Sequence, residues 1–99
     1  MSGMDPEWGS QDDLDEHFED HGALLGCQTV TEYELSSKST IDTGTFFTYR
    51  DRSTGERRLG YYDPFTGRFS AVNEDGDTIV THFRCGERYI RGLPENDYR

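Results

Sequence analysis

The chain has 99 residues, the usual size of one domain, and its 20 acidic and ten basic residues give a formal net charge of −10 at pH 7. Such a charge repels nucleic acid and favours a basic partner. No apolar run approaches the length of a membrane span, which argues against a membrane protein and favours a soluble one. Hydrophobic residues make up 31% of the chain and aromatic residues 13%, so we expect a small core built mainly from Phe and Tyr.

The negative charge is confined to the N-terminal third. Residues 1–37 contain ten acidic residues and no Lys or Arg, whereas residues 38–99 contain ten acidic and ten basic residues and sum to zero. Two interpretations of the acidic third stay open. It is either a solvated helix face behind a disordered leader, or a surface that docks a basic protein.

The first expected element is a short acidic helix. Residues 1–9 are expected to form a loose leader, either disordered or derived from the expression vector. Ser10 is a typical helix N-cap, and Asp13 follows it with the spacing of a capping box. Gly22 is typical of a helix end. The sequence therefore predicts a helix over residues 11–21.

A second capping-box signal follows at Thr29 and Glu32. It predicts a short helix that ends at about Ser37, so the helical segment as a whole covers residues 10–37. Residues 36–44 are polar and rich in turn-forming types, which predicts a loop.

The second half of the chain has the period of β-strands. Aromatic and β-branched residues recur there between short turns rich in Gly, Pro, Asn and Asp, and loops this short join antiparallel neighbours. Residues 86–99 show no clear period and are expected to form a tail. The sequence thus predicts one α+β domain over residues 10–99, with a four-stranded antiparallel β-meander at 45–84 whose strands cover 45–50, 57–62, 68–72 and 78–84.

Two histidines are the first candidates for chemistry. His17 and His21 lie four residues apart, so they share one face of the predicted helix, and histidine exchanges protons near neutral pH. They also resemble half of a zinc site, but no third ligand has supporting spacing, so we expect neither a metal nor another cofactor. The alternative is two surface histidines among acidic neighbours. Cys27 and Cys85 are compatible with one disulfide or with two free thiols.

The last predicted strand carries a hydroxyl, an imidazole and a guanidinium. Because side chains alternate along a strand, they are divided between two faces, and the hydroxyl cannot easily meet the other two groups. One face receives Ile79, Thr81 and Phe83, and the other Val80, His82 and Arg84.

Arginines are frequent around the first predicted hairpin. A guanidinium binds phosphate through two parallel hydrogen bonds, and nearby aromatic rings could stack an RNA base. The alternative is ordinary surface solubility, with pairing to neighbouring acids. The arginines of this hairpin are Arg50, Arg52, Arg57 and Arg58.

The order of several short motifs is more specific than any single residue. His17-Phe-Glu-Asp-His21-Gly precedes Thr29-Val-Thr-Glu-Tyr33-Glu, and Tyr62-Asp-Pro-Phe-Thr-Gly-Arg-Phe69 precedes Asp75-Gly and Thr78-Ile-Val-Thr-His-Phe-Arg84. Together with the closing Leu93-Pro-Glu-Asn-Asp-Tyr98, this order resembles toxin domains at the ends of bacterial polymorphic toxins. These domains belong to the barnase–EndoU–colicin–RelE (BECR) superfamily of ribonucleases, and the resemblance covers residues 14–98.

The resemblance implies an endoribonuclease that works without metal. In such enzymes the ribose 2′-hydroxyl attacks the adjacent phosphate and leaves a 2′,3′-cyclic phosphate. It implies an RNA substrate such as tRNA, an immunity or antitoxin protein as partner, and action in the bacterial cytoplasm after delivery by a secretion system. The implied catalytic residues are His21, His17, Thr81 and Arg84. The implied phosphate ligands are Arg50, Arg58 and His82, and the implied base-stacking residues are Tyr62 and Tyr98.

Three features differ from the family pattern. The helix after Tyr33 is expected to be shorter, His82 stands where the family often has an aromatic residue, and the chain is strongly acidic. The acidity keeps a second hypothesis open. In it the protein is a non-enzymatic module of the same fold, an inhibitor or an assembly subunit, whose acidic third docks a basic partner protein.

Overall fold

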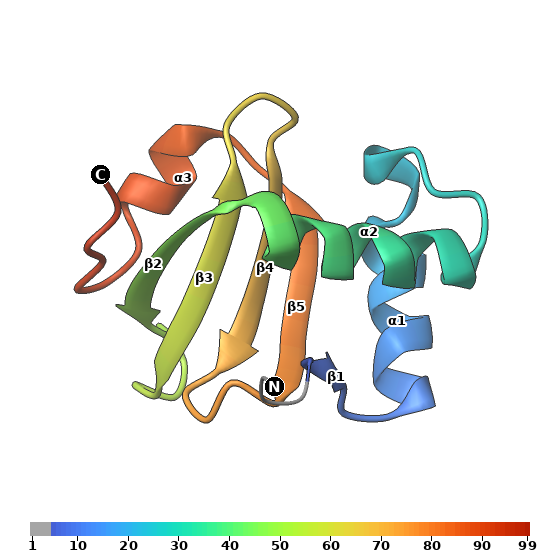
Figure 1. Ribbon diagram of the computed structural model, residues 1–99, viewed down its shortest axis with the longest axis horizontal. Coiled ribbons are helices and arrows are strands. Elements are labelled where there is room, and N and C mark those ends of the chain that lie inside the picture. The colour runs from blue at the N-terminus through green and yellow to red at the C-terminus, as the bar shows by residue number, and fades with distance from the viewer. Residues whose placement is uncertain (1–4) are drawn as a thin grey trace.

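The computed structural model describes residues 5–99 and contains a five-stranded sheet with helices on both faces (Figure 1). Four strands are antiparallel neighbours, β2 (Thr45–Arg50), β3 (Arg57–Asp63), β4 (Arg68–Asn73) and β5 (Thr78–Arg84). The prediction of an α+β fold is confirmed, and the predicted four-stranded antiparallel meander agrees with the sheet only in outline. The sheet as a whole is mixed, because a fifth strand, β1 (Glu7–Trp8), lies parallel to β5.

Strand β1 lies within the predicted leader. Its pairing reaches Thr78 and Ile79 of β5, and the Trp8 indole Nε1 donates a hydrogen bond to Ser37 Oγ at 3.0 Å. The expectation of a loose leader is therefore wrong for these two residues. Two residues are too few to produce a recognisable strand period, which is why the sequence did not predict this strand. Residues 1–4 of the leader lie outside the described part of the chain.

Helix α1 (Gln11–His21) has the predicted bounds. Ser10 Oγ accepts a hydrogen bond from the Asp13 amide at 3.0 Å, which is the expected N-cap. A short 3₁₀ turn, η1 (Ala23–Leu25), follows.

Helix α2 (Val30–Thr43) begins where predicted but is longer, and the predicted loop at 36–44 is wrong. Thr29 Oγ1 caps it by accepting from the Glu32 amide at 3.1 Å. Polar residues suggested a loop because their hydroxyls compete with helical hydrogen bonds. In the structure these hydroxyls instead donate to carbonyls three or four residues earlier, from Ser37 to Glu34 at 2.7 Å and from Thr40 to Ser36 at 2.9 Å.

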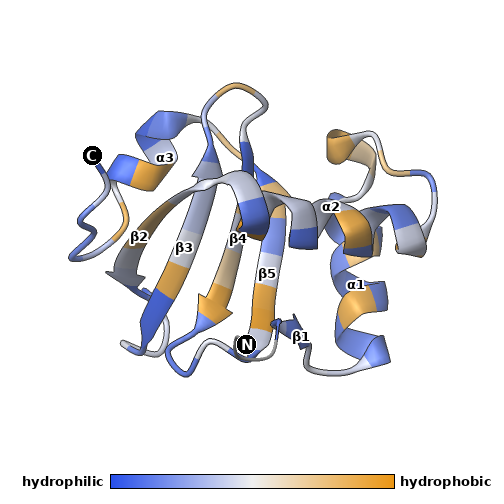
Figure 2. Cartoon of the chain, in the orientation of Figure 1, coloured by the Kyte–Doolittle hydropathy of each residue, from blue (hydrophilic) through white to orange (hydrophobic). Residues whose placement is uncertain are grey.

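The sheet separates two clusters of the core. Helices α1 and α2 pack on one face around Trp8, Leu14, Tyr33, Val72 and Ile79. Helix α3 (Glu87–Arg91), which the sequence did not predict, packs through Ile90 on the opposite face. That face is lined by Phe47, Tyr49, Tyr62, Phe69 and Ala71. Figure 2 shows that apolar residues recur along the strands and the helices, whereas most connections between strands are hydrophilic.

A bulge in β5 changes which residues share a face. Thr81 pairs with Ala71 but Ile79 pairs with Val72, so Val80 is the extra residue between them. As a result Ile79 packs on the helical side with α1 and α2, whereas Phe83 packs against the cluster under α3. Simple alternation had placed Ile79 on the same face as Phe83, and that prediction is wrong.

The C-terminal tail covers the outer edge of β2. The Thr48 amide donates to Asp97 Oδ1 at 2.7 Å, and the Thr48 carbonyl accepts from the Asp97 amide at 3.1 Å. The Arg50 amide donates to the Pro94 carbonyl at 2.9 Å. The tail therefore satisfies backbone groups that a free edge strand would leave open.

Gly60 is required by the packing of the sheet, and Gly60→Ala is expected to destabilise the protein by about 1–3 kcal/mol. A Cβ added there would lie 2.6 Å from Phe47 Cζ in the core, so the ring and the strand would have to separate. Urea denaturation measures the loss. Gly86→Ala is the matched control, because a Cβ there meets nothing within 4 Å, and an equal loss in both variants would contradict the packing argument.

Candidate functional site

Helix α1 lies beside the edge of the sheet that β1 and β5 form (Figure 1). The His21 ring lies 5.4 Å from the Phe83 ring, centroid to centroid, and 6.0 Å from the His17 ring. The His17 ring lies in turn 5.0 Å from Trp8. Leu14 faces the core, so the histidines follow the side of the helix that turns toward β5.

A hydrogen bond fixes the proton position on the His17 ring, and burial acts on the His21 ring. His17 Nδ1 lies 2.9 Å from the Asp13 carbonyl oxygen, and because a carbonyl only accepts, Nδ1 carries a hydrogen and a neutral ring has its lone pair on Nε2. Burial, and next the proximity of His17, lower the pKa of His21 below its usual 6.5, against a smaller opposite effect of Asp20. His21 is therefore neutral at pH 7 and able to accept a proton.

A cavity of about 290 Å³ opens on the α3 face of the sheet, and neither histidine lines it. Thr81 and Phe83 of β5 line it, and Phe83 stands between the cavity and His21. The Tyr89 ring of α3 meets Phe83 edge-on at 5.6 Å and is 45% exposed. The other lining residues are Tyr49, Asp51, Arg52, Ser53, Phe69 and Leu93. We call this space the β5 cavity.

The positive charge at the β5 cavity comes from the first hairpin. Arg52 lines it, with one guanidinium nitrogen donating to the Gly92 carbonyl at 2.8 Å. Arg58 is the cross-strand partner of Tyr49, so it lies on the same face, and it pairs with Glu56 at 2.8 Å. Of the two predicted phosphate ligands on this hairpin, Arg58 thus lies on the cavity's face of the sheet, but it lines a separate pocket with Glu56 and Asn73. Arg50 lies on the other face and is bound to Glu95 at 3.3 Å and to the Gly55 carbonyl at 2.8 Å.

His82 is part of the core. It is completely buried under α2, where its Nε2 lies 2.8 Å from Ser36 Oγ. Its Nδ1 donates to the Phe69 carbonyl at 2.9 Å and lies 2.9 Å from Ser70 Oγ. The Tyr33 hydroxyl donates to its backbone carbonyl. With no exposed atom, His82 has nothing to offer a phosphate, and we do not retain it as a ligand.

The two tyrosines predicted to stack bases are occupied by packing. Tyr62 is 2% exposed and its hydroxyl donates to the Cys85 carbonyl at 3.0 Å. Tyr98 meets the Tyr62 ring edge-on at 5.9 Å and lies under the Arg91 guanidinium at 5.0 Å. Tyr89 is the exposed ring at the cavity instead, and the sequence did not single it out because the tail showed no period.

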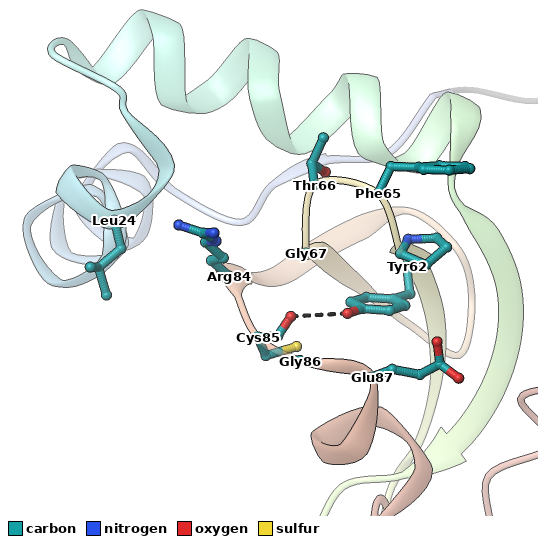
Figure 3. A pocket seen from close by; sticks show the side chains of 10 residues that line it. Leu24, Tyr62, Phe65, Thr66, Gly67, Arg84, Cys85, Gly86 and Glu87 are labelled. Carbon is teal, nitrogen blue, oxygen red and sulfur yellow. Dashed lines mark hydrogen bonds between the residues drawn. The ribbon is translucent and has the colours of Figure 1, made fainter.

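Arg84 lines a different cavity from Thr81 (Figure 3). The two residues lie on opposite faces of β5, as the sequence predicted. Thr81 opens on the α3 face, whereas Arg84 lies on the face against which α1 and α2 pack, so the structure does not gather His17, His21, Thr81 and Arg84 into one cavity. The arginine that lines the β5 cavity with Thr81 is Arg52, whose place in a turn gave no periodic signal.

Among residues 5–99 no three His, Cys, Asp or Glu side chains gather as a metal ion would require. Cys27 and Cys85 are free thiols, and burial raises the pKa of Cys85 to about 11, which makes it a poor nucleophile. Within the same residues, the helices are too short or too polar to cross a bilayer.

Comparison of the chain with protein-family models, with curated proteins and with solved structures found no match.

Proposed function

We propose that this protein is a metal-independent endoribonuclease that cleaves RNA by attack of a ribose 2′-hydroxyl and leaves a 2′,3′-cyclic phosphate. One observation carries the proposal. A neutral imidazole, His21, contacts the wall of an open cavity that also presents the Thr81 hydroxyl and the Arg52 guanidinium. These are the three kinds of group that the reaction needs, namely a base, a hydrogen-bond donor and a cation.

His21 accepts the proton of the 2′-hydroxyl as the oxygen forms its bond to phosphorus. The bond from phosphorus to the 5′-oxygen then breaks, and that oxygen takes a proton from the imidazolium of His17. A separation of 6.0 Å between the two rings allows each to reach one side of a phosphodiester placed at this edge. The reaction transfers protons and one phosphoryl bond, and it uses no external electron donor or acceptor.

The remaining groups stabilise the charge that develops on the phosphorane. Arg52 and Arg58 provide positive charge on the cavity face, and the Thr81 hydroxyl can donate to a phosphoryl oxygen. The exposed Tyr89 ring offers a surface on which a base can stack.

A second function is favoured by the acidic side of α1. Asp12, Asp13, Glu16, Glu19 and Asp20 are exposed, and none of them forms an ion pair with another residue in the range 5–99. This surface suits a basic protein. We propose that it docks a basic immunity or antitoxin protein of the ribonuclease, and a non-catalytic module would use the same surface.

The test is incubation of the purified protein with tRNA and with total RNA in EDTA. We expect fragments that end in a 2′,3′-cyclic phosphate, identified by mass spectrometry. Intact RNA after long incubation at high protein concentration would overturn the proposed ribonuclease activity and leave the acidic binding module as the better supported function.

The acidic surface should slow the enzyme by repelling its substrate. Glu16→Gln combined with Glu19→Gln is expected to raise kcat/KM for RNA a few-fold at low salt, and the gain should fade in 0.5 M salt because exposed charges are then screened. Asp5→Asn combined with Asp42→Asn is the matched control, since both lie near the C-terminal end of α2. An equal gain from the control pair would show that net charge alone is responsible.

A further inference from the structure

A second cavity, of about 530 Å³, lies where the β3–β4 turn faces the end of β5 and the start of α3 (Figure 3). Ligand pockets of this size accept a nucleotide or a similar molecule. Leu24 and Phe65 stand on opposite sides of Arg84 at its opening. We call this space the turn cavity, and its lining also includes Tyr62, Thr66, Gly67, Cys85 and Glu87.

The turn that carries Phe65 is held rigidly. Asp63 fixes it from one side, accepting from the Phe65 amide at 2.9 Å and from the Thr66 hydroxyl at 2.9 Å. Gly67, at φ 77°, completes the turn, and its carbonyl accepts from the Cys85 amide at 2.8 Å. Phe65 is nevertheless 96% exposed. An ordered backbone therefore presents a bare aromatic ring to solvent, beside a cavity.

Arg84 supplies the cavity with a free positive charge. It is exposed, and the ion pairs among residues 5–99 do not include it. The acid that shares the cavity is Glu87, and Arg91 binds its carboxylate at 2.7 Å on α3. A cation beside an exposed ring is the combination that recognises the phosphate and the base of a nucleotide.

The two cavities follow one another along β5. Thr81 and Phe83 line the β5 cavity, and Cys85, the next residue on the same face, lines the turn cavity. A single strand bound at the β5 cavity can therefore continue past Phe83 to Cys85, at the end of β5, where the turn cavity also receives Arg84 from the opposite face of the strand.

We propose that the turn cavity is a nucleotide subsite for the RNA residue next to the scissile phosphate, with its phosphate on Arg84 and its base stacked on Phe65. The inference rests on the proposed ribonuclease function. It adds a binding role for Phe65, and it moves Arg84 from the reacting phosphate to the neighbouring one.

The test maps binding of a 2′-O-methyl tetranucleotide, which has no attacking hydroxyl, by amide chemical shifts of the full chain. We expect shifts at residues 63–67 and 84–87 as well as around His21 and Thr81. Arg84→Gln and Phe65→Leu should each lower the affinity of the protein for the tetranucleotide about tenfold. The affinity for a single nucleoside monophosphate should not change. Arg88→Gln is the matched loss of charge on an exposed arginine outside both cavities.

The outcomes separate this subsite from the proposed function. Shifts confined to the β5 cavity, with unchanged affinity of both variants, would overturn the subsite and keep the ribonuclease. Full affinity in Phe65→Leu, with loss in Phe65→Ser, would point to an apolar protein-docking surface and also overturn it. If wild-type protein neither cleaves RNA nor shifts with the tetranucleotide, both proposals fall.

Discussion

Replacing His21 with alanine is expected to lower the rate of RNA cleavage by about 100- to 10,000-fold, because the 2′-hydroxyl loses its proton acceptor. The ring is only half-buried at the edge of the sheet, so the variant should fold, which a thermal melt would establish. Initial rates with end-labelled RNA measure the effect. Gln11→Ala is the matched control, since it changes an exposed, uncharged residue of the same helix.

The pH dependence of the wild-type enzyme tests the role of His21 more directly. A base must be unprotonated, so cleavage should rise with pH and level off above the pKa of His21. Because burial lowers that pKa, the acid limb of the profile is expected to have its midpoint below 6.5. Undiminished RNA cleavage by both His21→Ala and His17→Ala would keep the class of reaction and discard these two residues as its catalysts.

A loss of stability in mild acid, caused by His82, is the second large effect. The buried ring has a pKa of about 4, against 6.5 for an exposed histidine, because burial disfavours its charged form. As the pH falls through 6.5, His82 takes up a proton in the unfolded chain, whereas in the folded chain it stays neutral until about pH 4. Stability is therefore complete above pH 6.5 and is lost between these values, by about 2 kcal/mol from pH 7 to pH 5.

Urea denaturation of the wild type and of His82→Gln at pH 7, 6 and 5 would measure this loss. The variant should be less stable at pH 7, because Ser36 and Ser70 lose their partner, but its stability should depend less on pH. His21, whose pKa is also lowered, adds a smaller slope of the same sign in both proteins. An identical pH slope in wild type and variant would contradict the assignment of this loss to His82.

The elements that the sequence predicted well are those specified by local chemistry. Ser10 and Asp13 fixed the start of α1, and the Gly and Asp residues of the turns fixed β2 to β5. The end of α2 was missed because Ser36 and Thr40 are poor helix residues by themselves, and they are tolerated only where the buried sheet contact holds them. Strand β1 depends on a long-range pairing with β5, and no local pattern reveals such a contact.

The sequence predicted which residues could take part in the candidate site, but it did not predict where in the fold those residues lie. The motif order singled out His17, His21 and Thr81, and in the structure the two imidazoles lie near each other, with His21 against Phe83, the residue that lines the cavity together with Thr81. The sequence could not predict that His82 is buried in the core, because that burial depends on α2 crossing the sheet above it. The sequence also grouped Arg84 with the catalytic residues, although alternation along β5 sends it to the other cavity.

The pairing of the tail with β2 has a consequence for how the protein behaves at high concentration. At one margin of the sheet Asp97 and Pro94 occupy the hydrogen-bonding groups of Thr48 and Arg50, and at the other β1 and α1 stand against β5. Both margins are thus partly covered, at Thr48 and Arg50 of β2 and at Thr78 and Ile79 of β5. The tail, whose Tyr98 ring also packs against Phe47 and Tyr62, thereby opposes the strand-by-strand growth of fibrils from the β2 edge.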